Sequence, residues 1–224
     1  MMPVYTLRGT EVVPIEDVSI SVLSGVVNYG LGCFEGIRAY WNDSEKQLYV
    51  FRLQDHLRRL QSSGEILHIR LPDNIDSISL AICELLRAEN CREDVYIRPL
   101  AYKDNLKLGS RLDRLDDAIL TWVTPITDDP RYERGLKVTI SDTRRINADA
   151  VPSEAKLTGT YINPILARTN AQIAGYDDCI LLNSSGNVAE GSGWNILLIK
   201  DQTLVTPALS EGILEGLTRD ALLS

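Results

Sequence analysis

The side chains that this sequence offers for chemistry are lysines, carboxylates, tyrosines and arginines. Only two histidines occur, His56 and His68, and the four cysteines at 33, 83, 91 and 179 form no Cys-x-x-Cys pair. A zinc site would have to be assembled from scattered residues, so reduced thiols are the expectation. With only two histidines, the sequence offers few candidates for a metal-bound water or a Ser–His nucleophile. The sequence therefore predicts no metal site.

The glycine spacing suggests a phosphate-binding turn, but the residues that follow do not fit one. The run Gly30-x-Gly32-x-x-x-Gly36 is spaced in the manner of a dinucleotide-binding turn, which needs a strand before it and a helix after it. Residues 34–40 instead read as a strand. No Gly-x-x-x-x-Gly-Lys-Ser/Thr, Gly-x-Ser-x-Gly or His-Glu-x-x-His motif occurs. The glycines are therefore expected to serve tight backbone turns.

Two expected strands each carry a set of side chains on one face. Tyr96 and Arg98 stand two residues apart, and because successive side chains of a strand alternate, both point to the same side. Phe34, Gly36 and Arg38 share a face for the same reason.

Hydrophobic periodicity outlines the elements that must position these residues. Helices are expected at 55–66, at 75–86 with Asp73 or Asn74 as the cap, at 162–174, and from Thr218 onward. Strands are expected at 4–13 (two strands and a turn), 34–40, 47–53, 95–100, 118–124, 136–141, 178–182, 187–189, 195–199 and 204–206. This irregular order favours an α+β fold over a doubly wound sheet. A loop at 127–135 predicts a smaller N-terminal lobe at 1–128 and a larger C-terminal lobe at 129–224.

Composition excludes several classes of protein. The 224 residues carry a net charge of −8, which disfavours binding to nucleic acid or anionic lipid. With 44% hydrophobic and 24% charged residues, the chain has an ordinary globular composition. The N-terminus lacks an apolar signal-peptide core, and no apolar run approaches the ~20 residues of a membrane helix. A cytoplasmic protein is the expectation.

Five ordered blocks between residues 29 and 220 point to one family. They are Tyr29-Gly30-x-Gly32-x-Phe34-Glu35-Gly36-Ile37-Arg38-Ala39-Tyr40, Phe51-Arg52-x-x-Asp55-His56-x-x-Arg59-Leu60, Tyr96-Ile97-Arg98-Pro99-Leu100, Ala155-Lys156-x-x-Gly159-x-Tyr161-x-Asn163, and Ala189-Glu190-Gly191-Ser192-Gly193-x-Asn195 with Leu214-x-Gly216-Leu217-Thr218-Arg219-Asp220. In these blocks the chain resembles the class IV pyridoxal-phosphate aminotransferases, and among them the branched-chain amino-acid aminotransferases. The resemblance implies a two-lobe fold like that of D-amino-acid aminotransferase.

The resemblance also implies a pyridoxal 5′-phosphate cofactor and its contacts. Lys156 would condense with the cofactor's aldehyde and then move the proton of the substrate. Glu190 would keep the ring nitrogen protonated, and Tyr161 would bind the 3′-oxygen. Arg52, together with the backbone N–H groups of Leu217 and Thr218, would bind the phosphate. Arg59 and Arg219, by contrast, are interpreted as structural arginines.

For the substrate, the resemblance implies that Tyr96 binds the α-carboxylate and that Arg98 orients it. Phe34, Gly36 and Arg38 would line the wall of a pocket for a branched aliphatic side chain. Tyr29 would reach the site of a neighbouring subunit in a homodimer or higher homo-oligomer. The implied reaction moves the amino group of leucine, isoleucine or valine to 2-oxoglutarate, giving glutamate.

Two features depart from the family pattern and leave alternatives open. Trp194 stands where relatives often carry a smaller or acidic residue. The chain ends inside an expected helix at Ser224, so we expect an incomplete C-terminal lobe. The alternatives are another enzyme of the same fold (a D-amino-acid or (R)-amine transaminase, or an aminodeoxychorismate lyase) and a truncated, non-catalytic fragment.

Overall fold

The computed structural model describes residues 3–71, 73–104, 111–127 and 129–224. The chain divides into two compact units. Unit 1 comprises Met1–Thr127 and Ala155–Gly159, and unit 2 comprises Asp128–Glu154 and Thr160–Ser224. Asp128, the residue at the expected lobe boundary, lies outside the described residues.

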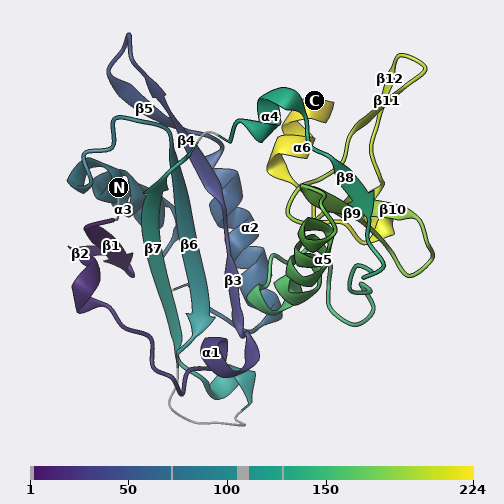
Figure 1. Ribbon diagram of the computed structural model, residues 1–224. Helices are drawn as coiled ribbons and strands as arrows, with labels where there is room; N and C mark the ends of the chain where they lie inside the picture. The colour runs from purple at the N-terminus through teal and green to yellow at the C-terminus, as the bar shows by residue number, and fades with distance from the viewer. Residues whose placement is uncertain (1–2, 72, 105–110, 128) are drawn as a thin grey trace. The chain divides into compact units, whose positions relative to one another are not determined.

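Unit 1 is built on an antiparallel sheet. Its strand order is β2-β1-β7-β6-β4-β5, with β3 also paired to β6 (Figure 1). The strands are β1 (Tyr5–Arg8), β2 (Glu11–Pro14), β3 (Gly32–Phe34), β4 (Ile37–Asn42), β5 (Gln47–Val50), β6 (Val95–Lys103) and β7 (Asp117–Pro125). The long pair β6–β7 forms the centre of this sheet.

Strands β3 and β4 lie along the same edge of β6 in one register. The strand expected over 34–40 is interrupted between them at Glu35 and Gly36, opposite Pro99. The N–H of Glu35 donates to the carbonyl of Pro99 at 3.0 Å. Pro99 has no N–H with which to return the bond, so the ladder is weakened at this point.

The helices of unit 1 are α1 (Gly25–Tyr29), α2 (Leu53–Ile66) and α3 (Ile75–Ala88), and α2 and α3 cover one face of the sheet (Figure 1). Asn74 caps α3, since its side chain accepts from the N–H of Ser77 at 2.9 Å. Arg52 takes a left-handed backbone conformation just before α2, so the strand expected over 47–53 ends early. The core between sheet and helices includes Leu7, Ile37, Ile97, Ile119, Leu57, Leu60, Ile78, Ile82 and Leu85.

Unit 2 has a small mixed sheet in the order β10-β9-β8. Its helix α5 packs on β9 through two alanines, Ala167 and Ala171, whose small side chains allow close approach to Cys179 and Leu181. The elements are α4 (Arg131–Arg134), β8 (Val138–Ile140), α5 (Ile162–Ile173), β9 (Asp178–Leu182), β10 (Val188–Gly191), the hairpin of β11 (Leu198–Lys200) and β12 (Thr203–Val205), and α6 (Leu217–Leu223).

The secondary structure confirms the expected α+β class and corrects two further details. The segment expected as a loop contains the short helix α4. The strand expected over 195–199 begins only at Leu198, because Asn195 is held by side-chain hydrogen bonds instead of a ladder. Among the helices of the described residues, none combines the length and the apolar composition that a membrane-spanning helix needs.

Candidate active site

The backbone of Lys156 is fixed in unit 1 by contacts on both sides. The N–H of Phe34 donates to the carbonyl of Lys156 at 3.1 Å. The N–H of Lys156 donates in turn to the hydroxyl of Ser63 on α2, also at 3.1 Å. The next residue, Leu157, forms an isolated antiparallel bridge with Cys33 of β3. The lysine therefore extends from a segment docked against β3 and α2.

The side chain of Lys156 lies near an aromatic ring that a second cation also contacts. Its Nζ is 5.1 Å from the centroid of the Phe34 ring, and Cζ of Arg98 is 4.2 Å from the same centroid. Cations are attracted to the face of such a ring. Phe34 is only 8% exposed. One buried ring thus brings together the amine and the guanidinium that the sequence predicts to meet the cofactor and the substrate.

Gly36 and Tyr96 complete this face of the sheet. A Cβ added at Gly36 would overlap the hydroxyl of Tyr96, so the glycine permits a close approach. Tyr96 also stacks on Arg98, with 5.1 Å between the guanidinium carbon and the ring centroid. Arg38 pairs with Tyr96 across the ladder and is exposed. The structure therefore gathers these residues along β3, β4 and β6.

Arg52 and Tyr29 belong to other elements of unit 1. Arg52 precedes α2, and its Nε donates to Asp55 Oδ2 at 2.7 Å. This hydrogen bond holds the pKa of Asp55 below its ordinary value. Tyr29 ends α1 and is 57% exposed. Arg59, interpreted as structural, is largely buried and paired with Glu35.

Glu190 is buried in unit 2 on a strand with an irregular register. The pairing of β10 with β9 shifts by one residue between Val188 and Glu190. Such a bulge re-aims the side chains that follow it and is common beside active sites. Arg145 donates to Glu190 Oε1 at 2.8 Å, and the N–H of Leu214 donates to Oε2 at 3.1 Å. The amide of Asn195 adds a third donor, to Oε2 at 3.3 Å.

Asn195 also links Glu190 to the beginning of α6. A Cβ at Gly216 would overlap the side-chain oxygen of Asn195, so these residues are in close contact. The helix begins directly afterwards with Leu217 and Thr218, which lie in its first turn. Unit 2 therefore brings the predicted ring partner and the predicted phosphate-binding amides into one connected cluster.

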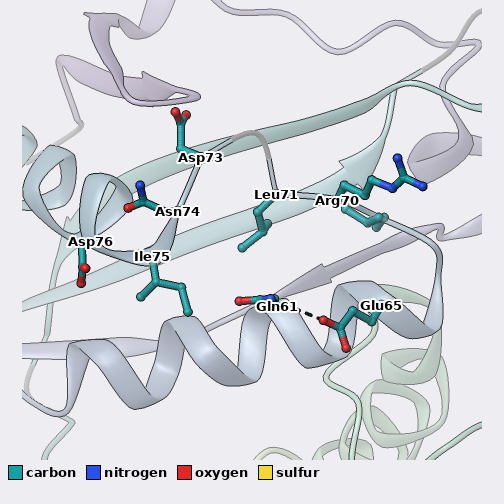
Figure 2. Close-up of a pocket in the computed structure, with 9 residues that line it drawn as sticks. Gln61, Glu65, Arg70, Leu71, Asp73, Asn74, Ile75 and Asp76 are labelled. Atoms are coloured by element: carbon teal, nitrogen blue, oxygen red, sulfur yellow. Dashed lines mark hydrogen bonds between the residues drawn. The ribbon is translucent and has the colours of Figure 1, made fainter.

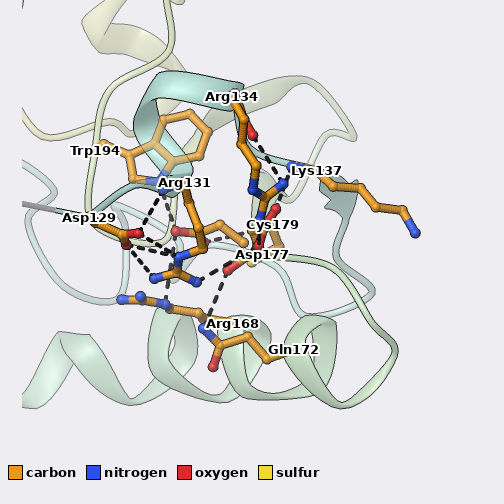
Figure 3. Close-up of polar contacts among 11 residues, drawn as sticks. Asp129, Arg131, Arg134, Lys137, Arg168, Gln172, Asp177, Cys179 and Trp194 are labelled. Atoms are coloured by element: carbon orange, nitrogen blue, oxygen red, sulfur yellow. Dashed lines mark hydrogen bonds and ion pairs between the residues drawn. The ribbon is translucent and has the colours of Figure 1, made fainter.

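Trp194 fills the turn that follows Glu190. A Cβ at Gly191 would overlap the indole, and the N–H of Gly191 donates to the Trp194 carbonyl at 2.7 Å. The indole Nε1 donates to the buried Asp178 at 3.1 Å, within the network that Figure 3 shows around Asp177 and Arg131. Trp194, whose effect the sequence did not predict, thus anchors the turn beside Glu190.

Arg219 and Tyr161 occupy defined positions in unit 2. Arg219 donates to the carbonyl of Pro207 at 3.0 Å and to the hydroxyl of Thr206 at 3.2 Å, so it ties α6 to the loop before it. Tyr161 ends a 3-10 helix at Thr158–Tyr161 and is partly buried just before α5.

Sequence reasoning gave no role to several residues that the structure places at these sites. Ser63 shares the buried face of α2 with Leu60, and a polar residue on that face was a usable signal. Asn195 lay inside a quoted block without an assigned role. Arg145 offered no signal, since its link to Glu190 joins distant parts of the chain.

A pocket in unit 1 lies outside this set of residues. It is lined by Gln61, Glu65, Ile69, Arg70, Leu71, Asp73, Asn74, Ile75 and Asp76, between the end of α2 and the beginning of α3 (Figure 2). None of the predicted site residues lines it.

Known proteins resemble the chain over nearly its whole length. The profile of the family "Amino-transferase class IV" matches residues 32–224. A probable branched-chain-amino-acid aminotransferase of Aquifex aeolicus is 40% identical over 214 residues, which are 96% of this chain and 69% of that protein. The chain thus spans about two thirds of this relative.

Solved structures agree with this assignment. The branched-chain aminotransferase of Thermoproteus uzoniensis with norvaline superposes with a TM-score of 0.92 and 38% identity, over 98% of this chain and 73% of that one. The enzyme of Thermobaculum terrenum in its pyridoxal-phosphate form gives 0.89 and 34%, over 99% and 72%. The fold, the matched profile and the relatives together show that this chain belongs to the class IV aminotransferase family.

Proposed function

We propose that this chain binds pyridoxal 5′-phosphate and transfers the amino group of branched-chain L-amino acids to 2-oxoglutarate. One observation carries the proposal: the amine of Lys156 and the guanidinium of Arg98 share the buried ring of Phe34. A reactive amine beside a group that can bind a carboxylate is what transamination of an amino acid requires. The relative in its pyridoxal-phosphate form supports the choice of cofactor.

The residues present fit this cofactor chemically. Glu190 is a buried carboxylate fixed by three N–H donors, and it would accept a hydrogen bond from a protonated ring nitrogen. Tyr161 would donate to the 3′-oxygen. Arg52 and the first-turn N–H groups of α6, at Leu217 and Thr218, would bind the phosphate. When bound, pyridoxal phosphate supplies an electron sink for the carbanion formed at the substrate.

Within this arrangement each side chain of unit 1 has a task. Lys156 would hold the cofactor's aldehyde carbon and, once displaced, carry the proton to and from the substrate α-carbon. Tyr96 and Arg98 would bind and orient the α-carboxylate. Phe34, with Gly36 beside it, would form an apolar wall that excludes water from the reacting carbon.

The choice of a branched aliphatic substrate rests on two relatives. The one from Thermoproteus uzoniensis was solved with norvaline, an unbranched aliphatic amino acid, which supports an aliphatic side chain. The relative from Aquifex aeolicus is named a probable branched-chain-amino-acid aminotransferase, which supports the branch. We further propose a homodimer or higher homo-oligomer, in which the exposed Tyr29 reaches the site of the neighbouring subunit. Arg38, also exposed, would lie at the mouth of the same pocket.

An absorbance experiment tests the proposed chemistry. Purified chain is mixed with pyridoxal phosphate, and its spectrum is recorded before and after addition of L-leucine. We expect the band of lysine-bound cofactor, followed by conversion to the pyridoxamine form. Lys156→Ala should abolish both signals. Lys137→Ala is the matched control, because Lys137 also lies over an aromatic ring, that of Tyr176, and should leave both signals unchanged. No band with the unmodified chain would refute the proposal.

A panel of amino donors tests the substrate. L-leucine, D-alanine and (R)-1-phenylethylamine are compared with 2-oxoglutarate as acceptor. We expect the highest rate with L-leucine. A preference for D-alanine or for the amine would reassign the chain within its family.

A further inference from the structure

A buried carboxylate lies between two residues of the proposed pocket wall. Glu35 is fully buried and stands between Phe34 and Gly36. Arg59 of α2 binds it with both arms of its guanidinium, Nε to Oε1 at 2.6 Å and Nη2 to Oε2 at 2.7 Å. His56, one turn earlier on α2, places Nδ1 2.8 Å from Oε2. We call these three residues the Glu35 cluster.

The cluster needs an explanation because burying charges is costly. Burial alone would raise the pKa of Glu35, but the hydrogen bonds from Arg59 and His56 outweigh it, and the pKa lies below its ordinary value. A buried ion pair often contributes no more stability than apolar residues of the same volume. The role of the Glu35 cluster is therefore better inferred from where it lies than from how much stability it contributes.

The cluster restrains the chain where the ladder is interrupted. Side chains alternate along a strand, so Phe34 and Gly36 point to one face while Glu35 points to the other, toward α2. This is the position where Pro99 returns no backbone hydrogen bond to Glu35. The side-chain bonds to Arg59 and His56 fix the backbone here in place of the missing ladder bond.

The same helix also fixes Lys156. Ser63, whose hydroxyl accepts from the N–H of Lys156, follows His56 by two helical turns. His56 and Ser63 both belong to the buried side of α2. The Glu35 cluster includes two residues of α2, and Ser63 lies on the same helix. Through this helix, the position of the Phe34 ring is therefore linked to the backbone of Lys156.

We propose that Glu35 is a positioning residue for transamination, which sets Phe34 and Gly36 against Lys156 through its bonds to α2. This inference rests on the proposed function for its catalytic consequence. Its structural part, the fixing of two segments by one carboxylate, can be measured without catalysis.

The test compares two buried ion pairs of unit 1. Glu35→Gln removes the charge and keeps the size of the side chain. Asp117→Asn is the matched control, because Asp117 pairs at 2.6 Å with Lys103, which is 1% exposed and on the same sheet. Amide hydrogen exchange is measured over residues 30–40 and 153–160 of the full chain, with and without pyridoxal phosphate. Steady-state kinetics are measured with L-leucine, and thermal unfolding is followed for each variant.

We expect Glu35→Gln to raise exchange at least about tenfold in both segments and to lower kcat/KM by up to about 10²-fold, since small misplacements near reacting groups have effects of this size. Asp117→Asn should lower the melting temperature without either change. Equal melting losses with unchanged exchange in both segments would overturn the proposal.

Two further measurements cover the cases in which Glu35→Gln does not fold or the unmodified chain shows no transamination. If Glu35→Gln does not fold, exchange is measured in the double variant with Arg59→Gln, which leaves no unpaired buried charge. Protected segments in that variant would also overturn the proposal. If the unmodified chain shows no transamination, the proposed function fails, and the exchange data alone decide whether Glu35 fixes the two segments.

Discussion

Gly36 and Tyr96 approach each other so closely that the sheet has no room for a side chain at position 36. A Cβ there would overlap the tyrosine hydroxyl and stand 2.9 Å from Cζ. The hydroxyl end of the tyrosine ring therefore lies against the backbone just before β4, and the guanidinium carbon of Arg98 is 5.1 Å from the centroid of the same ring. This contact fixes where Tyr96 lies against the proposed pocket wall.

Gly36→Ala should displace Tyr96 and destabilise the chain by about 1–3 kcal/mol, the usual cost of overpacking. Denaturant unfolding measures this loss. In a Tyr96→Ala background the same substitution should cost much less, since the clashing ring is gone. Equal costs in both backgrounds would show that the contact is not what excludes a side chain.

Arg145→Met should weaken unit 2 strongly. It removes the guanidinium from the largely buried Glu190, and breaking such a pair typically costs about 3–5 kcal/mol. The affinity for pyridoxal phosphate should fall as well. Arg168→Met is the matched control: Arg168 is about half exposed and 3.9 Å from Asp178, so its loss should cost no more than about 1 kcal/mol. Chemical unfolding and cofactor titration of both variants provide the comparison.

Trp194→Phe should keep the packing on Gly191 and lose the hydrogen bond to Asp178. Hydrogen bonds to charged groups are worth about 1.5–3 kcal/mol, so urea unfolding should show a loss of that order. Trp41→Phe removes the same kind of bond, to Asp43, at an exposed position. That variant should lose less than about 1 kcal/mol. Matching losses would argue against a structural role for the indole of Trp194.

The lowered pKa of Glu35 predicts an acid-sensitive contribution to stability. Its stabilisation is fully present above the ordinary value of 4.5 and is lost as the pH falls through the lower pKa of the folded state. The difference in unfolding free energy between the unmodified chain and Glu35→Gln should be constant above pH 4.5 and shrink below it. Denaturant unfolding across the acid range measures this difference. A gap that widened on acidification would contradict the sign.

Arg52 and Arg59 can be compared directly as phosphate ligands. Our proposal assigns the phosphate to Arg52, so Arg52→Gln should weaken binding of pyridoxal phosphate more than binding of pyridoxal, which has no phosphate. Arg59→Gln should affect both compounds alike, because Arg59 is engaged with Glu35. Fluorescence titration with each compound decides. A phosphate-specific loss confined to Arg59→Gln would reassign the contact.

The sequence predicted the family and most elements because these depend on local pattern. The apolar period of α3 and the alternation around Tyr96 and Arg98 are such patterns. Contacts between distant segments were not predictable in the same way. The partners of Glu190 include Arg145 and Leu214, and the shift in β10 that aims Glu190 depends on its pairing with β9. The interruption at Glu35 needed the position of Pro99 across the ladder, which one strand alone does not reveal.

The docking of Ala155–Gly159 onto unit 1 also has a consequence for biosynthesis. The last strand of the large sheet ends at Pro125, about thirty residues before this segment, and domains fold from the N-terminus as the chain is made. Until the segment emerges from the ribosome, β3 presents an uncovered backbone edge, and such edges promote aggregation. The stretch that carries Lys156 therefore also covers the edge of the nascent sheet.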